Sequence, residues 1–100
     1  MITINAYNKE YPITVDVALY HNKTMAVRLL SNGSFLATLS VNLPESIRLK
    51  PGEFYVKNWS ENLSFAEQLE AQGVIEKVDA PVVSSDFVGE IFAYRLVNQN

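Results

Sequence analysis

The side chains that could carry acid–base or metal chemistry are few and widely spaced. Glu67 and Glu70 stand three positions apart in a segment with helical patterning, so both carboxylates would share one helix face. Asp79 and Asp86 flank a loop that contains Pro81, and nothing in the sequence fixes the distance between them. A carboxylate pair can support hydrolysis or hold Mg²⁺, but acidic residues early in a helix also stabilise it by facing the positive end of its dipole.

The composition excludes most other catalytic sites. The chain has no cysteine, which excludes disulfides, thiolate zinc sites, iron–sulfur clusters and a cysteine nucleophile. Its single histidine, His21, falls in an expected hairpin turn, where a solvated side chain is the ordinary outcome. The four glycines are scattered singly, so neither a phosphate-binding loop nor a G-x-S-x-G motif is present. We therefore expect a protein that is not an enzyme and that uses no metal and no cofactor.

Charge is divided unevenly along the chain. Residues 1–60 contain six basic and four acidic side chains, a net charge of +2, whereas residues 61–90 have a net charge of −6 with Lys77 as their one cation. The acidic side chains of the second segment are Glu61, Glu67, Glu70, Glu76, Asp79, Asp86 and Glu90. This division predicts an acidic surface that meets a basic partner protein, and it argues against direct nucleic-acid binding. A solvated acidic helix with acidic loops is the alternative.

Trp59, the only tryptophan, lies in a polar segment beside these carboxylates. An exposed tryptophan is a frequent centre of binding energy in protein interfaces, whereas partial burial would give it a packing role. The candidate partner-binding residues are Trp59, Glu61, Glu67, Glu70, Glu76, Asp79 and Asp86.

The elements that position these residues begin with a meander. Apolar and polar side chains alternate over residues 13–20, 24–30 and 35–41, which predicts three strands, with Ile13, Val15, Val17 and Leu19 on one face. In the last strand, the same rule places Phe35, Ala37, Leu39 and Val41 on one face. Asn32-Gly33 predicts a tight type I′ turn, and residues 21–23 form the other turn. We therefore expect an antiparallel meander over residues 12–42, with residues 2–6 as a further edge strand.

The second half of the chain predicts one helix among further strands. Pro44 and Pro51 indicate a connection over residues 43–52 without regular structure, followed by a strand at 53–57. Ser64 and Glu67 form a capping-box pattern that begins a helix over residues 65–72, and Gly73 ends it. Residues 74–78 and 87–97 read as strands, the latter with a bulge at Gly89.

These elements predict one α+β domain over residues 1–100. Its antiparallel β-sheet would contain about five to seven strands, including the N-terminal meander, and one short α-helix. A small β-barrel is the alternative. Hydrophobic residues make up 48% of the chain, which suffices for one core, and the 11% of aromatic residues argues against disorder. Residues 1–5 lack a signal-peptide pattern and no apolar run has transmembrane length, so we expect a cytoplasmic protein without a membrane partner.

Several segments resemble a known family. Ala37–Glu45, Phe54–Asn62, Gly73–Glu76 and the terminal Phe87-Val88 and Tyr94–Leu96 are similar to a family of short uncharacterised proteins encoded by phages and conjugative elements of gut and Gram-positive bacteria. The resemblance assigns no catalytic residue. It implies a small accessory protein of a mobile element, and such proteins often inhibit host defence, as anti-restriction and anti-CRISPR proteins do.

The sequence and the resemblance together predict a stoichiometric inhibitor of a bacterial defence system. It would act in the cytoplasm of the host cell by binding a protein, for instance a nucleic-acid-binding defence complex, through its acidic surface and Trp59. One alternative is a structural homo-oligomer of the mobile element that pairs edge strands. Another is a small-ligand-binding domain with a pocket between sheet and helix.

Overall fold

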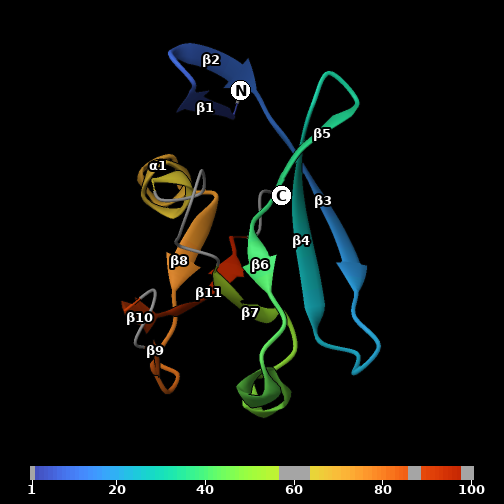
Figure 1. Cartoon of the computed structure of the whole chain (residues 1–100), viewed down its shortest axis with the longest axis vertical. Coiled ribbons are helices and arrows are strands. Elements are labelled where there is room, and N and C mark those ends of the chain that lie inside the picture. The colour runs from blue at the N-terminus through green and yellow to red at the C-terminus, as the bar shows by residue number, and fades with distance from the viewer. Residues whose placement is uncertain (1, 57–63, 86–88, 98–100) are drawn as a thin grey trace.

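A computed structural model of the chain describes residues 2–56, 64–85 and 89–97. In these segments, antiparallel strands predominate and a single α-helix packs against them (Figure 1). The strands of the described residues form four sheets of three, four, two and two strands, and none of these sheets closes into a barrel. The α+β prediction is therefore confirmed, and the barrel alternative is wrong.

The predicted meander is present as β3 (Thr14–Leu19), β4 (Met25–Ser31) and β5 (Ser34–Thr38). Asn32 and Gly33 both have positive φ, 52° and 81°, as a type I′ turn requires. This local geometry explains why alternation and turn residues alone located the three strands.

The alternation rule is wrong about two of the predicted faces. Leu29 lies opposite Ala37, but Leu30 lies opposite Phe35, so Leu36 is an extra residue that forms a bulge. The bulge turns Phe35 away from the buried Ala37 and leaves it 63% exposed. In β3, burial of the predicted apolar face ends early, because Val17 is 47% and Leu19 is 67% exposed.

The N-terminal strand belongs to a hairpin of its own. β1 (Thr3–Ala6) pairs with β2 (Lys9–Pro12) and is not an edge of the meander. Tyr7 and Asn8 supply the positive φ angles of the turn, 52° and 59°. β2 is not among the predicted strands, because its residues, Lys-Glu-Tyr-Pro, show no alternation of apolar and polar side chains.

A four-stranded sheet forms the centre of the molecule. Its strands are, in spatial order, β6 (Ser40–Val41), β7 (Glu53–Val56), β11 (Ala93–Leu96) and β8 (Ile75–Lys77). The predicted final strand is divided, because β10 (Gly89–Ile91) pairs with β9 (Val83–Ser85) in a separate hairpin. Between β6 and β7, where we expected no regular structure, residues Pro44–Arg48 form a 3-10 helix, η1.

Helix α1 (Phe65–Ala71) ends as its sequence predicts. Gly73 has a φ of 74°, and the N–H groups of Gly73 and Val74 donate to the carbonyls of Glu70 and Leu69, which completes a Schellman motif. The predicted capping box is wrong, because the side chain of Ser64 makes no cap hydrogen bond. Its hydroxyl instead accepts a hydrogen bond from the Gln68 amide at 3.0 Å.

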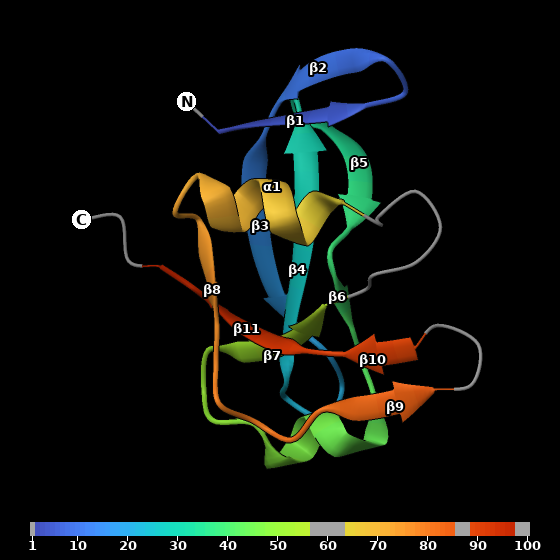
Figure 2. The same ribbon diagram turned by 90° about the vertical axis from the view of Figure 1, so that its left-hand side faces the viewer.

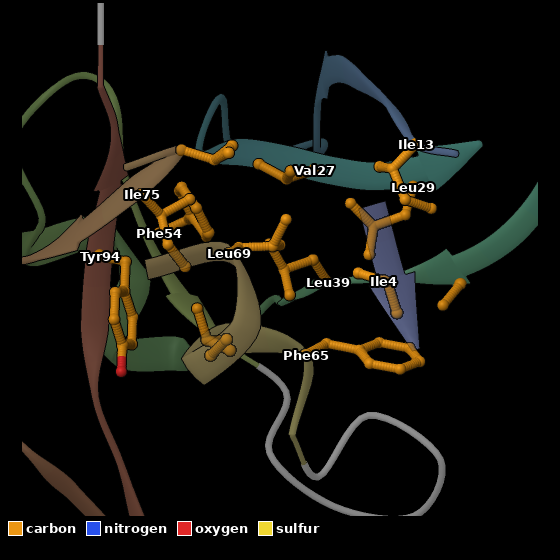
Figure 3. Close-up of a cluster of buried hydrophobic side chains, with 14 residues drawn as sticks. Ile4, Ile13, Val27, Leu29, Leu39, Phe54, Phe65, Leu69, Ile75 and Tyr94 are labelled. Carbon is orange, nitrogen blue, oxygen red and sulfur yellow. The ribbon is translucent and has the colours of Figure 1, made fainter. Parts of the chain in front are cut away.

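Apolar side chains cover both faces of the four-stranded sheet. The main cluster fills the space between this sheet, α1 and the meander; Leu69 of the helix lies in its middle and Phe65 lies beside Ile4 of β1 (Figure 3). Tyr55, Ile91 and Ala93 form a smaller cluster with neighbours that include Val83 of β9. Figure 2 shows α1 between the β1–β2 hairpin and the four-stranded sheet, with the meander behind it. Neither α1 nor η1 has the length and apolar character needed to cross a membrane, within the segments described.

Candidate functional site

Helix α1 divides its residues between the core and the solvent. Phe65, Ala66 and Leu69 are buried, whereas Glu67 and Glu70 are exposed. Because residues three apart are neighbours on a helix surface, the two carboxylates lie side by side, as the sequence predicts. The helix therefore presents a small, concentrated negative charge to the solvent.

Two glutamines fix the helix against the N-terminal hairpin. The Gln72 side chain accepts from the Thr3 N–H at 3.0 Å and donates to the Thr3 carbonyl. The Gln68 side chain makes the same pair of bonds with Asn5, at 2.7 and 3.0 Å. The four-residue spacing on the helix thus matches alternate peptide groups on the free edge of β1. These contacts hold the face that carries Glu67 and Glu70 in one orientation.

A hollow of about 360 Å³ opens between α1 and the four-stranded sheet. Glu67 and Glu70 line it from the helix, and Tyr94 and Lys77 line it from the sheet. Phe92, which directly precedes β11, lines it beside them. Val56 and Ala66 complete the lining. Acidic, aromatic and basic side chains are therefore brought together at one opening on the surface.

Lys77 lies against the aromatic side chains of this hollow. Its Nζ atom is 4.2 Å from the centre of the Phe92 ring and 5.9 Å from that of Tyr94, both within the range of cation–π attraction. Lys77 and Tyr94 are register partners on neighbouring strands, so the pairing of β8 with β11 sets this contact. The hollow thus already holds one cation on an aromatic wall.

The pKa of the Tyr94 hydroxyl is raised by its surroundings. Burial raises the pKa of its hydroxyl above the usual value of 10.0, and the negative charges of Glu70 and Glu67 raise it further. Its ring belongs to the main core, and its hydroxyl points away from the labelled core side chains in Figure 3. Burial and the two carboxylates therefore both favour the neutral phenol.

The other acidic candidates lie on a different surface. Glu76 and Lys77 are consecutive in β8, so their side chains point to opposite faces of the sheet. Glu76 forms an ion pair with Arg95, and together with the exposed Asp79 these residues line a second hollow with Lys50 and Glu53. Lys77 borders both hollows. The expectation of one continuous acidic surface is therefore wrong for the described carboxylates: Glu67 and Glu70 lie together, while Glu76 and Asp79 lie elsewhere among cations.

Three candidate residues fall outside the described segments. Trp59, Glu61 and Asp86 belong to residues 57–63 and 86–88, so their predicted roles stay predictions. His21 is exposed in the turn between β3 and β4, as expected. Within residues 2–56, 64–85 and 89–97, His, Asp and Glu side chains form no group of three that could hold a metal ion.

The aromatic wall formed by Phe92 and Tyr94 is not among the predicted site residues. Phe92 and Tyr94 lie within the predicted strand over residues 87–97, and Lys77 reads only as the one cation of residues 61–90. The wall could be predicted only from the pairing of β8 with β11. Lys77 and Tyr94 lie opposite each other in that pair, so their side chains are on the same face of the sheet. That pairing joins residues far apart in the chain and cannot be derived from local alternation.

Comparisons with known proteins add no relative to this description. No family model, no curated protein and no solved structure matches the chain.

Proposed function

We propose that this protein is a non-enzymatic binding module. The hollow between α1 and the four-stranded sheet accepts a basic side chain of a partner protein. The observation that carries the proposal is the placement of Glu67 and Glu70 side by side above Phe92 and Tyr94. A lysine or arginine of the partner would form ion pairs with the two carboxylates and would also contact the aromatic wall. Its binding would therefore combine charge attraction with apolar contact.

The cation that already lies on this wall supports the choice of ligand. The Nζ atom of Lys77 lies 4.2 Å from the centre of the Phe92 ring. Among the described contacts, Lys77 forms no ion pair with Glu67 or Glu70. The two carboxylates therefore keep capacity for a second cation. By contrast, Arg95 already pairs with Glu76, which makes the opposite face of β8 a weaker attractor for a basic partner.

The identity of the partner is proposed from the resemblance to proteins of phages and conjugative elements. On that basis the partner is a component of a bacterial defence system in the host cytoplasm, such as a nucleic-acid-binding complex. Binding would be stoichiometric and would block the partner's function without chemical change.

Affinity capture from a bacterial host lysate tests the proposal with two matched charge reversals. Glu67→Lys with Glu70→Lys changes the hollow, whereas Glu10→Lys with Asp79→Lys makes the same change in net charge at exposed positions elsewhere. We expect the wild type and the Glu10/Asp79 variant to retain a partner in equimolar amount and the Glu67/Glu70 variant to lose it. Equal retention by both variants would contradict the proposal.

The dimensions of the hollow favour a second candidate function, the binding of a small ligand. Its volume of about 360 Å³ falls at the lower end of the range for ligand pockets, and it lies between sheet and helix as that alternative requires. Native mass spectrometry of the purified protein distinguishes the two functions. A bound small molecule that Tyr94→Ala releases would favour ligand binding over protein binding.

A further inference from the structure

The outer edge of β3 offers unpaired backbone groups over a short, defined stretch. β3 is one of the two end strands of the meander, and no other described strand pairs with its outer side (Figure 1). Edge strands of this kind can pair with another chain, and proteins ordinarily protect them by charge, proline or covering elements. β3 has Asp16 as its one charged residue and has no proline.

The alternation of hydrogen bonds along β3 identifies which backbone N–H and C=O groups face outward. The Tyr20 N–H donates to the Thr24 carbonyl at 2.8 Å, which makes residues 20 and 24 a hydrogen-bonded pair of the β3–β4 hairpin. Since this pattern repeats every second residue, Ala18 and Asp16 direct their peptide groups toward β4, and Val15, Val17 and Leu19 direct theirs outward.

The free stretch has clear limits at both ends. At Ile13 the outward N–H is already used, because it donates to the Ile2 carbonyl at 2.8 Å. At the other end, the chain turns at residues 21–23. The unpaired edge therefore runs from Val15 to Leu19, and Val17 is its midpoint.

We propose that this edge pairs with the same edge of a second copy of the chain. A two-fold axis at Val17 would place Val17 opposite its counterpart and Val15 opposite Leu19 of the second copy, each as a hydrogen-bonded pair. Every outward peptide group of the stretch then finds a partner, and the two meanders become one continuous six-stranded sheet.

The side chains are compatible with this register. Val15, Val17 and Leu19 lie on one face in both copies, so pairing covers the two apolar side chains that are 47% and 67% exposed in one chain. On the other face, Asp16 lies opposite Ala18 and not opposite a second carboxylate. Asp16 is also paired with Arg28 of its own chain, which reduces repulsion between the copies.

The length of the free edge limits the area that the dimer can bury. Stable interfaces bury about 800 Å² on each partner, and a five-residue strand is only about 17 Å long. The pairing therefore falls at the small end of specific interfaces. We expect a reversible dimer that forms as the protein concentration rises.

Analytical ultracentrifugation over a wide concentration range tests the dimer. We expect the wild type to pass from monomer to dimer and Val17→Lys to remain monomeric, because a lysine at the midpoint places two like charges together. Phe35→Lys is the matched control: it replaces another exposed apolar side chain, 63% exposed on β5, and should dimerise as the wild type does. A wild type that stays monomeric, or a Val17→Lys variant that dimerises equally, would overturn the proposal.

Hydrogen exchange supplies a second measurement that does not depend on a variant. In the dimer, the amides of Val15, Val17 and Leu19 should exchange more slowly as concentration rises, while those of β5 should not change. Concentration-independent exchange at these three amides in a sample that dimerises would overturn the β3 assignment. Neither outcome concerns Glu67 or Glu70, so the test of the dimer is independent of the test of the proposed binding hollow.

Discussion

Ser40 is the buried polar residue at the junction between the meander and the four-stranded sheet. Its hydroxyl accepts from the Val27 N–H at 2.8 Å and hydrogen-bonds to the Tyr20 hydroxyl at 2.9 Å. We expect Ser40→Ala to lower the free energy of unfolding by about 1–3 kcal/mol, because the buried Val27 N–H loses its acceptor. Urea denaturation measures this loss.

Two control variants make the Ser40 result specific. Tyr20→Phe removes one bond and leaves the Val27 contact, so it should cost less, about 0.5–1.5 kcal/mol. Ser34→Ala, at an exposed position beside the Asn32-Gly33 turn, should change stability by less than about 0.5 kcal/mol. A Ser40→Ala cost no larger than that of Ser34→Ala would show that the hydroxyl is not needed there.

Two tyrosines make stability sensitive to alkaline pH. Burial, followed by the nearby carboxylates, raises the pKa of Tyr55 and Tyr94 above the usual 10.0. The unfolded chain therefore loses these protons at lower pH than the folded chain, so their contribution is fully present below pH 10 and is lost as pH rises through the folded pKa. We expect the urea midpoint to fall in this range, and less steeply in Tyr94→Phe. An unchanged slope in that variant would contradict the assignment to Tyr94.

At the scale of elements, Gln68 and Gln72 join α1 to the edge of β1. Replacing both with alanine removes the side-chain bonds to Thr3 and Asn5. We expect faster amide exchange at Thr3 and Asn5, with little change in the meander, because the hairpin opens locally while the core remains packed. Glu70→Ala, on the same helix, should leave this exchange unchanged; faster exchange throughout the chain in the glutamine variant would instead indicate a global role.

The elements also show what a single sequence can predict. Local signals sufficed for the Asn32-Gly33 turn, the three strands around it and the glycine that ends α1, because each depends on neighbours in the chain. The bulge at Leu36 and the pairing of β1 with β2 left no comparable pattern, since both depend on which strands meet. The exposure of Val17 has the same origin: alternation marks a face but not what covers it.

At the scale of the whole molecule, folding places the acidic side chains of residues 61–90 on different surfaces. The sequence concentrates acidic residues in 61–90, but strand parity sends Glu76 to one face of the sheet while α1 holds Glu67 and Glu70 on another surface. Charge counted along the chain does not separate these two surfaces, because it ignores which strands pair and which way each side chain points. It also could not predict that an aromatic wall and Lys77 lie beside Glu67 and Glu70.

The most direct test of the account is to map where a captured partner contacts the protein. Backbone amide shifts of the isotopically labelled chain, recorded with and without the unlabelled partner, report the contact surface residue by residue. We predict the largest changes at Glu67, Glu70, Lys77 and Tyr94, around the hollow beside α1. Changes centred on Glu76, Asp79 and Arg95, with α1 unaffected, would contradict it.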